Sequence, residues 1–254
     1  MKEFFRFKAL LYELTVRDIK VKYRRSILGL LWTVLNPLLM MFVLCFVFSK
    51  LFRFDIENYA IYVLSGQVIF NYFQMSTTDA MMAILNNGTL IKKVYIPKYM
   101  LVLVKILSGT VYLLASFAAL LVVMAVTGSK ISGPLFWVVP IFLNLMIFSL
   151  GVGLILAAIT VKFRDIMHLY GVFCTALFYL TPIMYPFSIL PEYVQEVVYY
   201  NPLTAIMDTF RLIVLEGQAP QPGRIFYSLG TSLIMLLVGK TVFKKRQKTF
   251  ILDL

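Results

Sequence analysis

Residues 101–127 read LVLVKILSGTVYLLASFAALLVVMAVT, and Lys105 is the only charged residue in this stretch. The hydrocarbon core of a bilayer takes about 20 apolar residues per helix, so the stretch predicts a transmembrane helix. Hydrophobic residues make up 61% of the 254 positions, whereas soluble domains contain about 45–50%. We therefore expect an integral membrane protein rather than a globular enzyme.

Further spans are predicted on both sides of this stretch: Ile27–Ser49, Tyr59–Leu85, Leu135–Val161, Leu169–Tyr185 and Ile225–Phe243. The fold class is thus an all-α membrane protein with six transmembrane helices, in one domain over residues 1–254. Its parts are a cytoplasmic interface helix (1–26), spans one to five (27–184), an external segment (185–217), span six (225–243) and a cytoplasmic tail (244–254).

The net charge of +12 is explained by orientation in the membrane. With six spans and both termini in the cytoplasm, 19 Lys and Arg residues lie inside and 5 outside, namely Lys50, Arg53, Lys130, Arg211 and Arg224. This asymmetry follows the positive-inside rule, and anionic lipid headgroups account for the basic balance. We expect no nucleic-acid partner.

The sequence offers little for catalysis or for cofactor binding. It contains one histidine and no cluster of carboxylates, which argues against a metal site. Asp79 and Asp208 are the only acids near the predicted membrane core, and neither has a neighbouring base or acid for proton transfer. A membrane-embedded glycosyltransferase or phosphatase is therefore poorly supported, and no cofactor is expected on this chain.

The N-terminal segment has the periodicity of a surface helix. One face carries the apolar residues Phe7, Leu10, Leu11, Leu14 and Val21. The other face carries the charged residues Arg6, Glu13, Arg17, Lys20 and Arg24. This pattern predicts an amphipathic helix in the cytoplasmic interface, which is either a plain membrane anchor or a docking surface for a partner.

The second predicted span carries a polar stripe. Its members follow the spacing i, i+4, i+7 and i+11: Gln67, Asn71, Gln74 and Thr78. Amides facing hydrocarbon are costly, so the stripe must face protein or water. It is either a set of interhelical hydrogen bonds or the wall of a pathway for a hydroxyl-rich solute. The interleaved rings of Phe70, Tyr72 and Phe73 either offer flat faces to sugar rings or simply pack.

The segment YYNPLTAIMDTFRLIVLEG (199–217) is apolar but too short to cross a bilayer. Asn201 suits the N-cap of a helix that starts at Pro202. Asp208 and Arg211 lie at i and i+3, where they can pair. The segment either dips into the membrane against other parts of the protein or lies on the surface as a hairpin that caps the bundle.

Three segments together resemble the membrane subunit of ATP-binding-cassette exporters that move lipid-linked polysaccharides. They are RDIKVKYRRSILGLLWTVLNPLL (17–39), KKVYIPKYMLV (92–102) and the run from Arg164 to Gly217. The most specific part pairs the pattern LG-x-x-W-x-x-x-x-P at Leu28–Pro37 with the later P-x-x-Y-P … NPL … R. The family includes O-antigen (lipopolysaccharide), capsule and teichoic acid exporters. Relatives of the same architecture that export drugs or small amphiphiles are the alternative.

The resemblance implies a homodimeric permease in the bacterial plasma (inner) membrane, working with two copies of a separate cytoplasmic ATPase that binds ATP and Mg. The implied ATPase-docking residues are Arg17, Lys20, Arg24, Lys92, Lys93, Pro97, Arg164 and Asp165. Residues 185–217 would form two short re-entrant helices, with an external gate at Asn201, Pro202, Asp208 and Arg211. The lipid-linked glycan would move from the cytoplasmic to the external side.

Overall fold

The computed structural model describes residues 7–24, 28–51, 56, 58–129 and 133–250. Arg6, Ile27, Arg53, Lys130 and residues 251–254 of the predicted tail lie outside these ranges. Every secondary-structure element of the described residues is helical, as the all-α prediction requires. The longer helices are α2 (Lys8–Tyr23), α3 (Trp32–Leu51), α4 (Tyr59–Met81), α6 (Tyr99–Val126), α7 (Val138–Thr160), α8 (Ile166–Leu180), α10 (Pro202–Val214) and α11 (Pro222–Arg246). The shorter ones are η1 (Gly29–Leu31), η2 (Leu85–Asn87), α5 (Gly88–Lys93), η3 (Gly133–Trp137), η4 (Phe187–Ile189) and α9 (Glu192–Tyr199).

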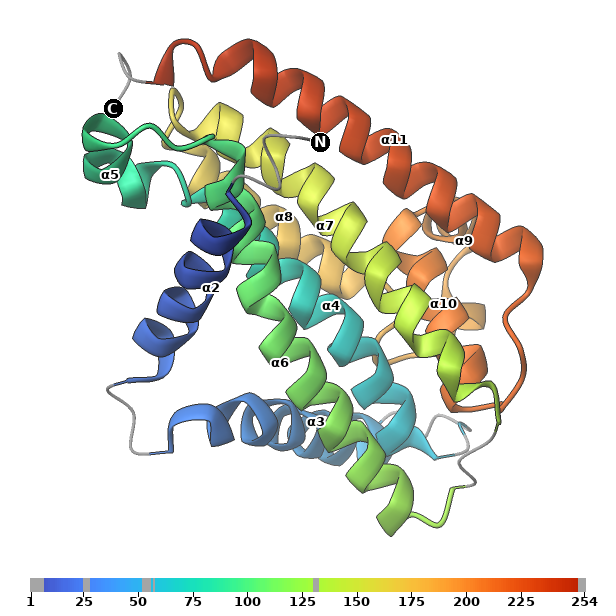
Figure 1. The fold of residues 1–254 in the computed structure, drawn as a ribbon. Coiled ribbons are helices and arrows are strands. Elements are labelled where there is room, and N and C mark those ends of the chain that lie inside the picture. The colour runs from blue at the N-terminus through green and yellow to red at the C-terminus, as the bar shows by residue number, and fades with distance from the viewer. Residues whose placement is uncertain (1–6, 25–27, 52–55, 57, 130–132, 251–254) are drawn as a thin grey trace.

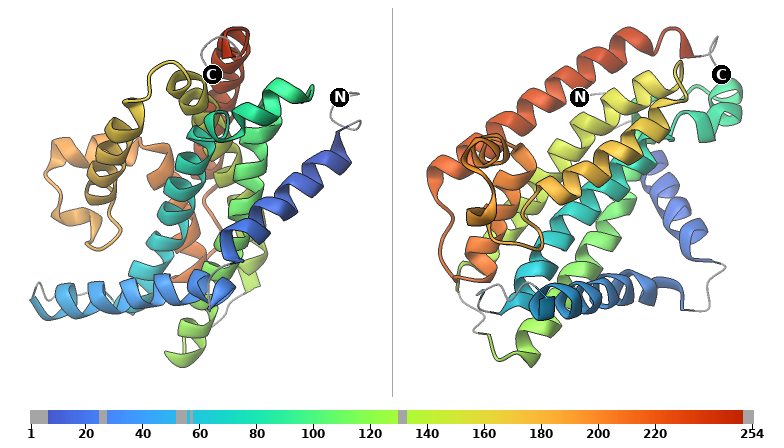
Figure 2. Two further views of the ribbon diagram at one scale, coloured as in Figure 1. Left: turned by 90° about the vertical axis from the view of Figure 1, so that its left-hand side faces the viewer. Right: turned by 180° about the vertical axis from the view of Figure 1, so that it is seen from behind.

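Helix α4 lies at the centre of the bundle. It packs between α6 and α7, and α11 runs along the outer side of α7 (Figure 1). Helix α3 crosses α4 and α6 at a steep angle at one end of the bundle, while α2 lies against α6 (Figure 2). The C-terminal end of α11 and α5 lie near each other, at the opposite end of the bundle from the turn between α6 and α7 (Figure 1).

Four segments of the described chain are long and apolar enough to cross a membrane: Gly29–Phe48, Tyr99–Val126, Pro134–Thr160 and Pro222–Arg246. A multi-pass membrane protein is therefore supported, but the count of six spans is not confirmed. Helix α8 is apolar and has only 15 residues, because the helix ends at Leu180 just before Pro182. Helix α4 has 23 residues, but its polar stripe lowers its hydropathy. Since α4 is surrounded by other helices, its side chains need not be apolar all round.

Small residues allow two close helix contacts. A Cβ added at Gly239 of α11 would lie 2.3 Å from the carbonyl oxygen of Gly151 on α7, so only glycine permits this approach. The four-residue spacing of Ser149, Gly153 and Ala157 predicts a small-residue face on the fourth span. That face packs inward, since a Cβ at Gly153 would come within 2.8 Å of the Ala80 Cβ on α4.

Two short helices, α9 and α10, follow α8 within residues 185–217, where the family resemblance implies two short re-entrant helices. The Asn201 side chain accepts a hydrogen bond from the Leu203 amide at 3.0 Å and caps α10, and Pro202 occupies its first turn. Helix α10 is buried against α4, α7 and α11, whereas most of α9 is exposed. The alternative of a hairpin on the protein surface therefore fits α9, but it does not fit α10, which is buried in the bundle. The depth of both helices in the membrane stays a prediction.

Candidate functional site

The polar stripe of α4 opens partly into a cleft between α3, α4 and α6. The cleft has a volume of about 330 Å³ and is lined by Asn36, Met40, Asn71, Gln74, Met75 and Tyr112. Asn71 and Gln74 are thus the two stripe amides at its wall. Thr78 is exposed and Gln67 is buried. The i, i+4, i+7, i+11 spacing therefore brings four polar groups to one side of α4, but only the middle two, Asn71 and Gln74, face this cleft.

The aromatic residues interleaved with the stripe are packed in the protein interior. The Phe70 and Phe73 rings lie 5.2 Å and 5.5 Å from those of Phe178 and Phe148. The hydroxyl of Tyr72 donates to the carbonyl of Ile106 at 3.1 Å. All three rings are buried, so they do not present flat faces to a solute in this conformation. Of the two alternatives for these rings, the structure supports packing.

Gln67 is unusual among the stripe residues because its amide is buried without a partner. The residue is 1% exposed, and neither its Nε2 nor its Oε1 has a hydrogen-bond partner among the described residues. An unsatisfied buried amide costs about 1–3 kcal/mol. The interhelical hydrogen bond that would explain a structural role is therefore absent at this position of the described chain.

Replacing Gln67 with leucine is expected to raise the free energy of unfolding by about 1–2 kcal/mol, because the substitution removes an unpaired polar group from the interior. The thermal unfolding midpoint of the purified protein in detergent measures this. Gln74→Leu is the matched control, since Gln74 lines an open cleft and its replacement should change stability by less than about 0.5 kcal/mol. A clear loss of stability in Gln67→Leu would show that the amide is hydrogen-bonded after all.

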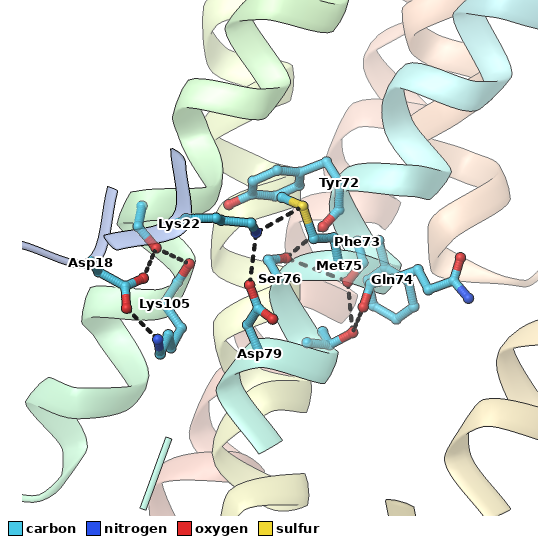
Figure 3. A network of polar contacts seen from close by, with 11 residues as sticks. Asp18, Lys22, Tyr72, Phe73, Gln74, Met75, Ser76, Asp79 and Lys105 are labelled. Atoms are coloured by element: carbon cyan, nitrogen blue, oxygen red, sulfur yellow. Dashed lines mark hydrogen bonds and ion pairs between the residues drawn. The ribbon is translucent and has the colours of Figure 1, made fainter. Parts of the chain in front are cut away.

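Ion pairs connect α2 to both α4 and α6. Figure 3 shows Asp18 and Lys22 of α2 directed toward Lys105 of α6 and Asp79 of α4. Asp18 forms an ion pair with Lys105 and accepts a hydrogen bond from the Ser108 hydroxyl at 2.7 Å. Lys22 Nζ lies 3.1 Å from Asp79 Oδ2. A displacement of α2 must therefore either break these contacts or carry α4 and α6 with it.

The two ion pairs differ in burial. The Asp18 and Lys105 side chains are each 18% exposed, whereas those of Lys22 and Asp79 are each 38% exposed. Exposed pairs contribute about 0–1 kcal/mol, while breaking a buried pair costs several times more because one charge stays behind. The Asp18–Lys105 pair is therefore the stronger link between α2 and the bundle.

The predicted amphipathic pattern of α2 is correct in part. Leu11 and Leu14 are buried against the bundle, and Arg17, Lys20 and Arg24 are exposed. Val21, predicted for the apolar face, is 69% exposed. This part of the prediction is wrong. In the last turns of α2, the side that faces the bundle carries Asp18 and Lys22, which pair with α6 and α4, and Val21 is left exposed.

Two of the predicted ATPase-docking segments lie side by side. Lys92 and Arg164 line one groove of about 400 Å³, between the residues around α5 and the turn from α7 to α8. Lys93 and Asp165, the residues that directly follow Lys92 and Arg164 in the sequence, are exposed, and Pro97 is half-buried. Arg17 of α2 approaches the same region, because its Nη2 donates to Asn87 Oδ1 at 3.4 Å. The structure thus gathers residues from three separate segments at one end of the bundle.

Arg211 is buried within a cage of neutral acceptors. Its guanidinium donates to the carbonyls of Pro182 at 2.6 Å, Ile183 at 3.0 Å and Tyr62 at 3.1 Å, and to Ser65 Oγ at 3.4 Å. It also lies 3.7 Å from the centroid of the Tyr62 ring, a cation–π contact. Arg211 thereby joins α10 to α4 and to the irregular segment that follows α8.

The predicted pairing of Asp208 with Arg211 is wrong. Asp208 Oδ2 instead accepts from Arg224 Nη2 of α11 at 2.8 Å. The guanidinium of Arg224 also lies 4.1 Å from the centroid of the Tyr199 ring. The i, i+3 rule describes an isolated helix, and here tertiary partners compete for both side chains. Of the predicted gate residues, Asn201 and Pro202 start α10, and Asp208 and Arg211 hold it to different neighbours.

Several interacting residues could not be located from the sequence. Asp18, Lys105 and Ser108 meet across 87 and 90 residues of chain. The only local signals were a lone lysine inside an apolar stretch and one of two acids on a basic helix. Among the described residues, no group of three or more histidine, cysteine or acidic side chains is placed to hold a metal ion.

Together, the apolar helices and the buried polar contacts define a multi-pass helical membrane protein. The sequence profile of the ABC-2 type transporter family matches residues 9–215, and the chain belongs to this family.

Individual relatives match along nearly their whole length. An O-antigen export system permease protein, RfbA of Klebsiella pneumoniae, is 29% identical over 242 residues, which cover 95% of this chain and 93% of the relative. RfbA of Myxococcus xanthus is 29% identical over 256 residues, covering 98% and 97%. The polysialic acid transport protein KpsM of Escherichia coli is 22% identical over 243 residues, covering 94% and 93%.

Proposed function

We propose that this chain is the permease subunit of an ATP-driven exporter that moves a lipid-linked polysaccharide of the O-antigen type across the plasma membrane. The observation that carries this proposal is the near-full-length similarity to O-antigen export permeases. The polysialic acid transport protein KpsM is also similar over most of the chain. The chain itself is not the motor, and a separate ATPase subunit binds and hydrolyses ATP with Mg.

The substrate pathway in this proposal begins at the cleft of Asn71 and Gln74. A glycan carries many hydroxyl groups, so it needs a hydrated wall with hydrogen-bonding groups rather than an apolar one. The cleft is an open groove, not an enclosed channel. A second copy of the chain would close it, which agrees with the implied homodimer. Gln67 and Thr78 continue the polar stripe along α4 before and after the two amides of the cleft.

The ATPase is proposed to dock at the end of the bundle that holds α5 and the turn between α7 and α8. Exposed Lys92, Lys93 and Arg164 supply positive charge there. Arg17 and Lys20 of α2 and Arg24 at its C-cap supply more. Because α2 is joined to α4 and α6 by ion pairs, a push on α2 would reach the cleft directly. In this proposal both termini lie in the cytoplasm, as the asymmetry of Lys and Arg in the sequence predicts.

The proposal is tested in a bacterial strain that lacks this protein. Undecaprenyl-linked glycan should accumulate on the cytoplasmic side of the plasma membrane, and a plasmid copy should reverse the accumulation. A strain that exports its glycan normally without the protein, while becoming sensitive to small amphiphiles, would contradict polysaccharide export.

A further inference from the structure

A groove on the outer side of the bundle combines an apolar wall with a cluster of lysines. It has a volume of about 520 Å³ and lies between α6, α7 and α11. Leu103 of α6, Leu150 and Leu154 of α7 and Leu236 of α11 line its apolar part. Lys240 and Lys244 of α11 stand at its edge.

A second groove continues from the same two lysines along α11. It has a volume of about 480 Å³ and is lined by Leu237, Lys240, Thr241, Lys244, Lys245 and Lys248. All four of its lysines are exposed. None takes part in the ion pairs of the described residues, and no aspartate or glutamate is among the described residues that line either groove.

The order of these side chains along α11 matches the order of parts in a phospholipid. Leu233 and Leu237 are exposed on the helix surface, and Lys240 and Lys244 follow them at intervals of three and four residues on the same side. Lys248, in the turn after α11, lines the second groove with them. Acyl chains would lie along the leucines, while a phosphate would lie among the lysines. Basic pockets between transmembrane helices bind anionic lipid headgroups by this combination of charge and apolar surface.

We propose that these two grooves form a binding site for an anionic diacyl phospholipid, such as phosphatidylglycerol, from the leaflet in which α11 ends. The headgroup phosphate contacts Lys240 and Lys244, and one acyl chain enters the groove of Leu103, Leu150 and Leu154. The bound lipid would occupy the groove between α6, α7 and α11, which is open among the described residues. The lysines of this site lie at the same end of the bundle as α5 (Figure 1), but its two grooves share no lining residue with the amide cleft or with the groove of Lys92 and Arg164.

The test is native mass spectrometry of the full purified chain in detergent, titrated with phosphatidylglycerol or phosphatidylcholine. Lys240→Gln/Lys244→Gln is expected to weaken phosphatidylglycerol binding roughly thirtyfold, since each lysine near an anionic headgroup contributes close to a factor of five to six. Lys8→Gln/Lys162→Gln removes the same charge from exposed positions elsewhere and should change binding less than about twofold.

A third variant separates the groove from its charges. Leu103→Trp fills the apolar part while leaving every lysine in place, and it should also weaken binding, with an unchanged unfolding midpoint to show that the chain is folded. The proposal is overturned if Leu103→Trp binds phosphatidylglycerol like the wild type, if the Lys8/Lys162 control loses as much, or if phosphatidylcholine binds equally well. It is also overturned if the Lys240/Lys244 variant keeps its lipid but loses the ATPase in co-purification, which would make this surface a protein-docking site.

Discussion

Arg211→Met is expected to lower the free energy of unfolding by on the order of 4 kcal/mol and to abolish export. The guanidinium satisfies the carbonyls of Pro182, Ile183 and Tyr62 at 2.6–3.1 Å. Methionine is unbranched like the arginine stem but is shorter and has no donors, so these buried carbonyls lose their partner. Helix α10 then loses its polar link to α4, and the segment after α8 loses its support.

The unfolding midpoint of the purified protein measures this loss. Arg211→Lys should recover part of the stability, because lysine keeps the positive charge. The recovery should be incomplete, since the lysine ammonium lacks the planar set of donors with which the guanidinium reaches several acceptors at once. Arg246→Met is the matched control: Arg246 is exposed near the end of α11, and its replacement should cost less than about 0.5 kcal/mol. An Arg211→Met protein that melts at the wild-type temperature would show that the cage does not hold α10.

The surroundings of Arg211 illustrate what the sequence could and could not predict. The start of α10 was predictable because Asn201 and Pro202 act on the backbone next to them. The partners of Arg211 could not be predicted, since they are backbone carbonyls of residues that lie 28 to 149 positions away in the sequence. Gly66 makes room for the guanidinium, as a Cβ there would lie 2.8 Å from Nη2. The sequence contains no local sign of that requirement.

The polar stripe shows the same division. The spacing of Gln67, Asn71, Gln74 and Thr78 predicted one polar side of a helix, because helical periodicity is a local property. Which amides are open depends on where α3 and α6 lie, so burial of Gln67 and exposure of Asn71 and Gln74 to a cleft required the structure. Likewise, the apolar stretches were predicted from composition, whereas the crossing of α3 and the Gly151–Gly239 contact depend on tertiary packing.

The second large effect is expected at the link between α2 and α6. Asp18→Lys should reduce export at least tenfold, because it sets two lysines against each other in a site that is only 18% exposed. Attachment of the ATPase should survive, since Asp18 faces the bundle rather than the exposed basic side of α2. Export of glycan and co-purification of the ATPase are the two measurements.

Exchanging the partners provides the decisive control. The double variant Asp18→Lys/Lys105→Asp restores opposite charges and should recover much of the export, with a coupling free energy of about 1–3 kcal/mol between the two positions. Asp79→Asn tests the more exposed pair and should cost less than about 1 kcal/mol. If the double variant exports no better than Asp18→Lys alone, the contact does not transmit movement from α2.

We propose that this chain carries a lipid-linked glycan across the bilayer when a bound ATPase moves α2, and this proposal has a direct test. It is tested most directly in proteoliposomes that contain the chain, its ATPase and lipid-linked glycan, by measuring how much glycan becomes accessible on the opposite face. We expect transfer that requires ATP hydrolysis and is lost in Asp18→Lys but largely regained in Asp18→Lys/Lys105→Asp. Transfer that proceeds equally without ATP, or in vesicles that lack the chain, would contradict it.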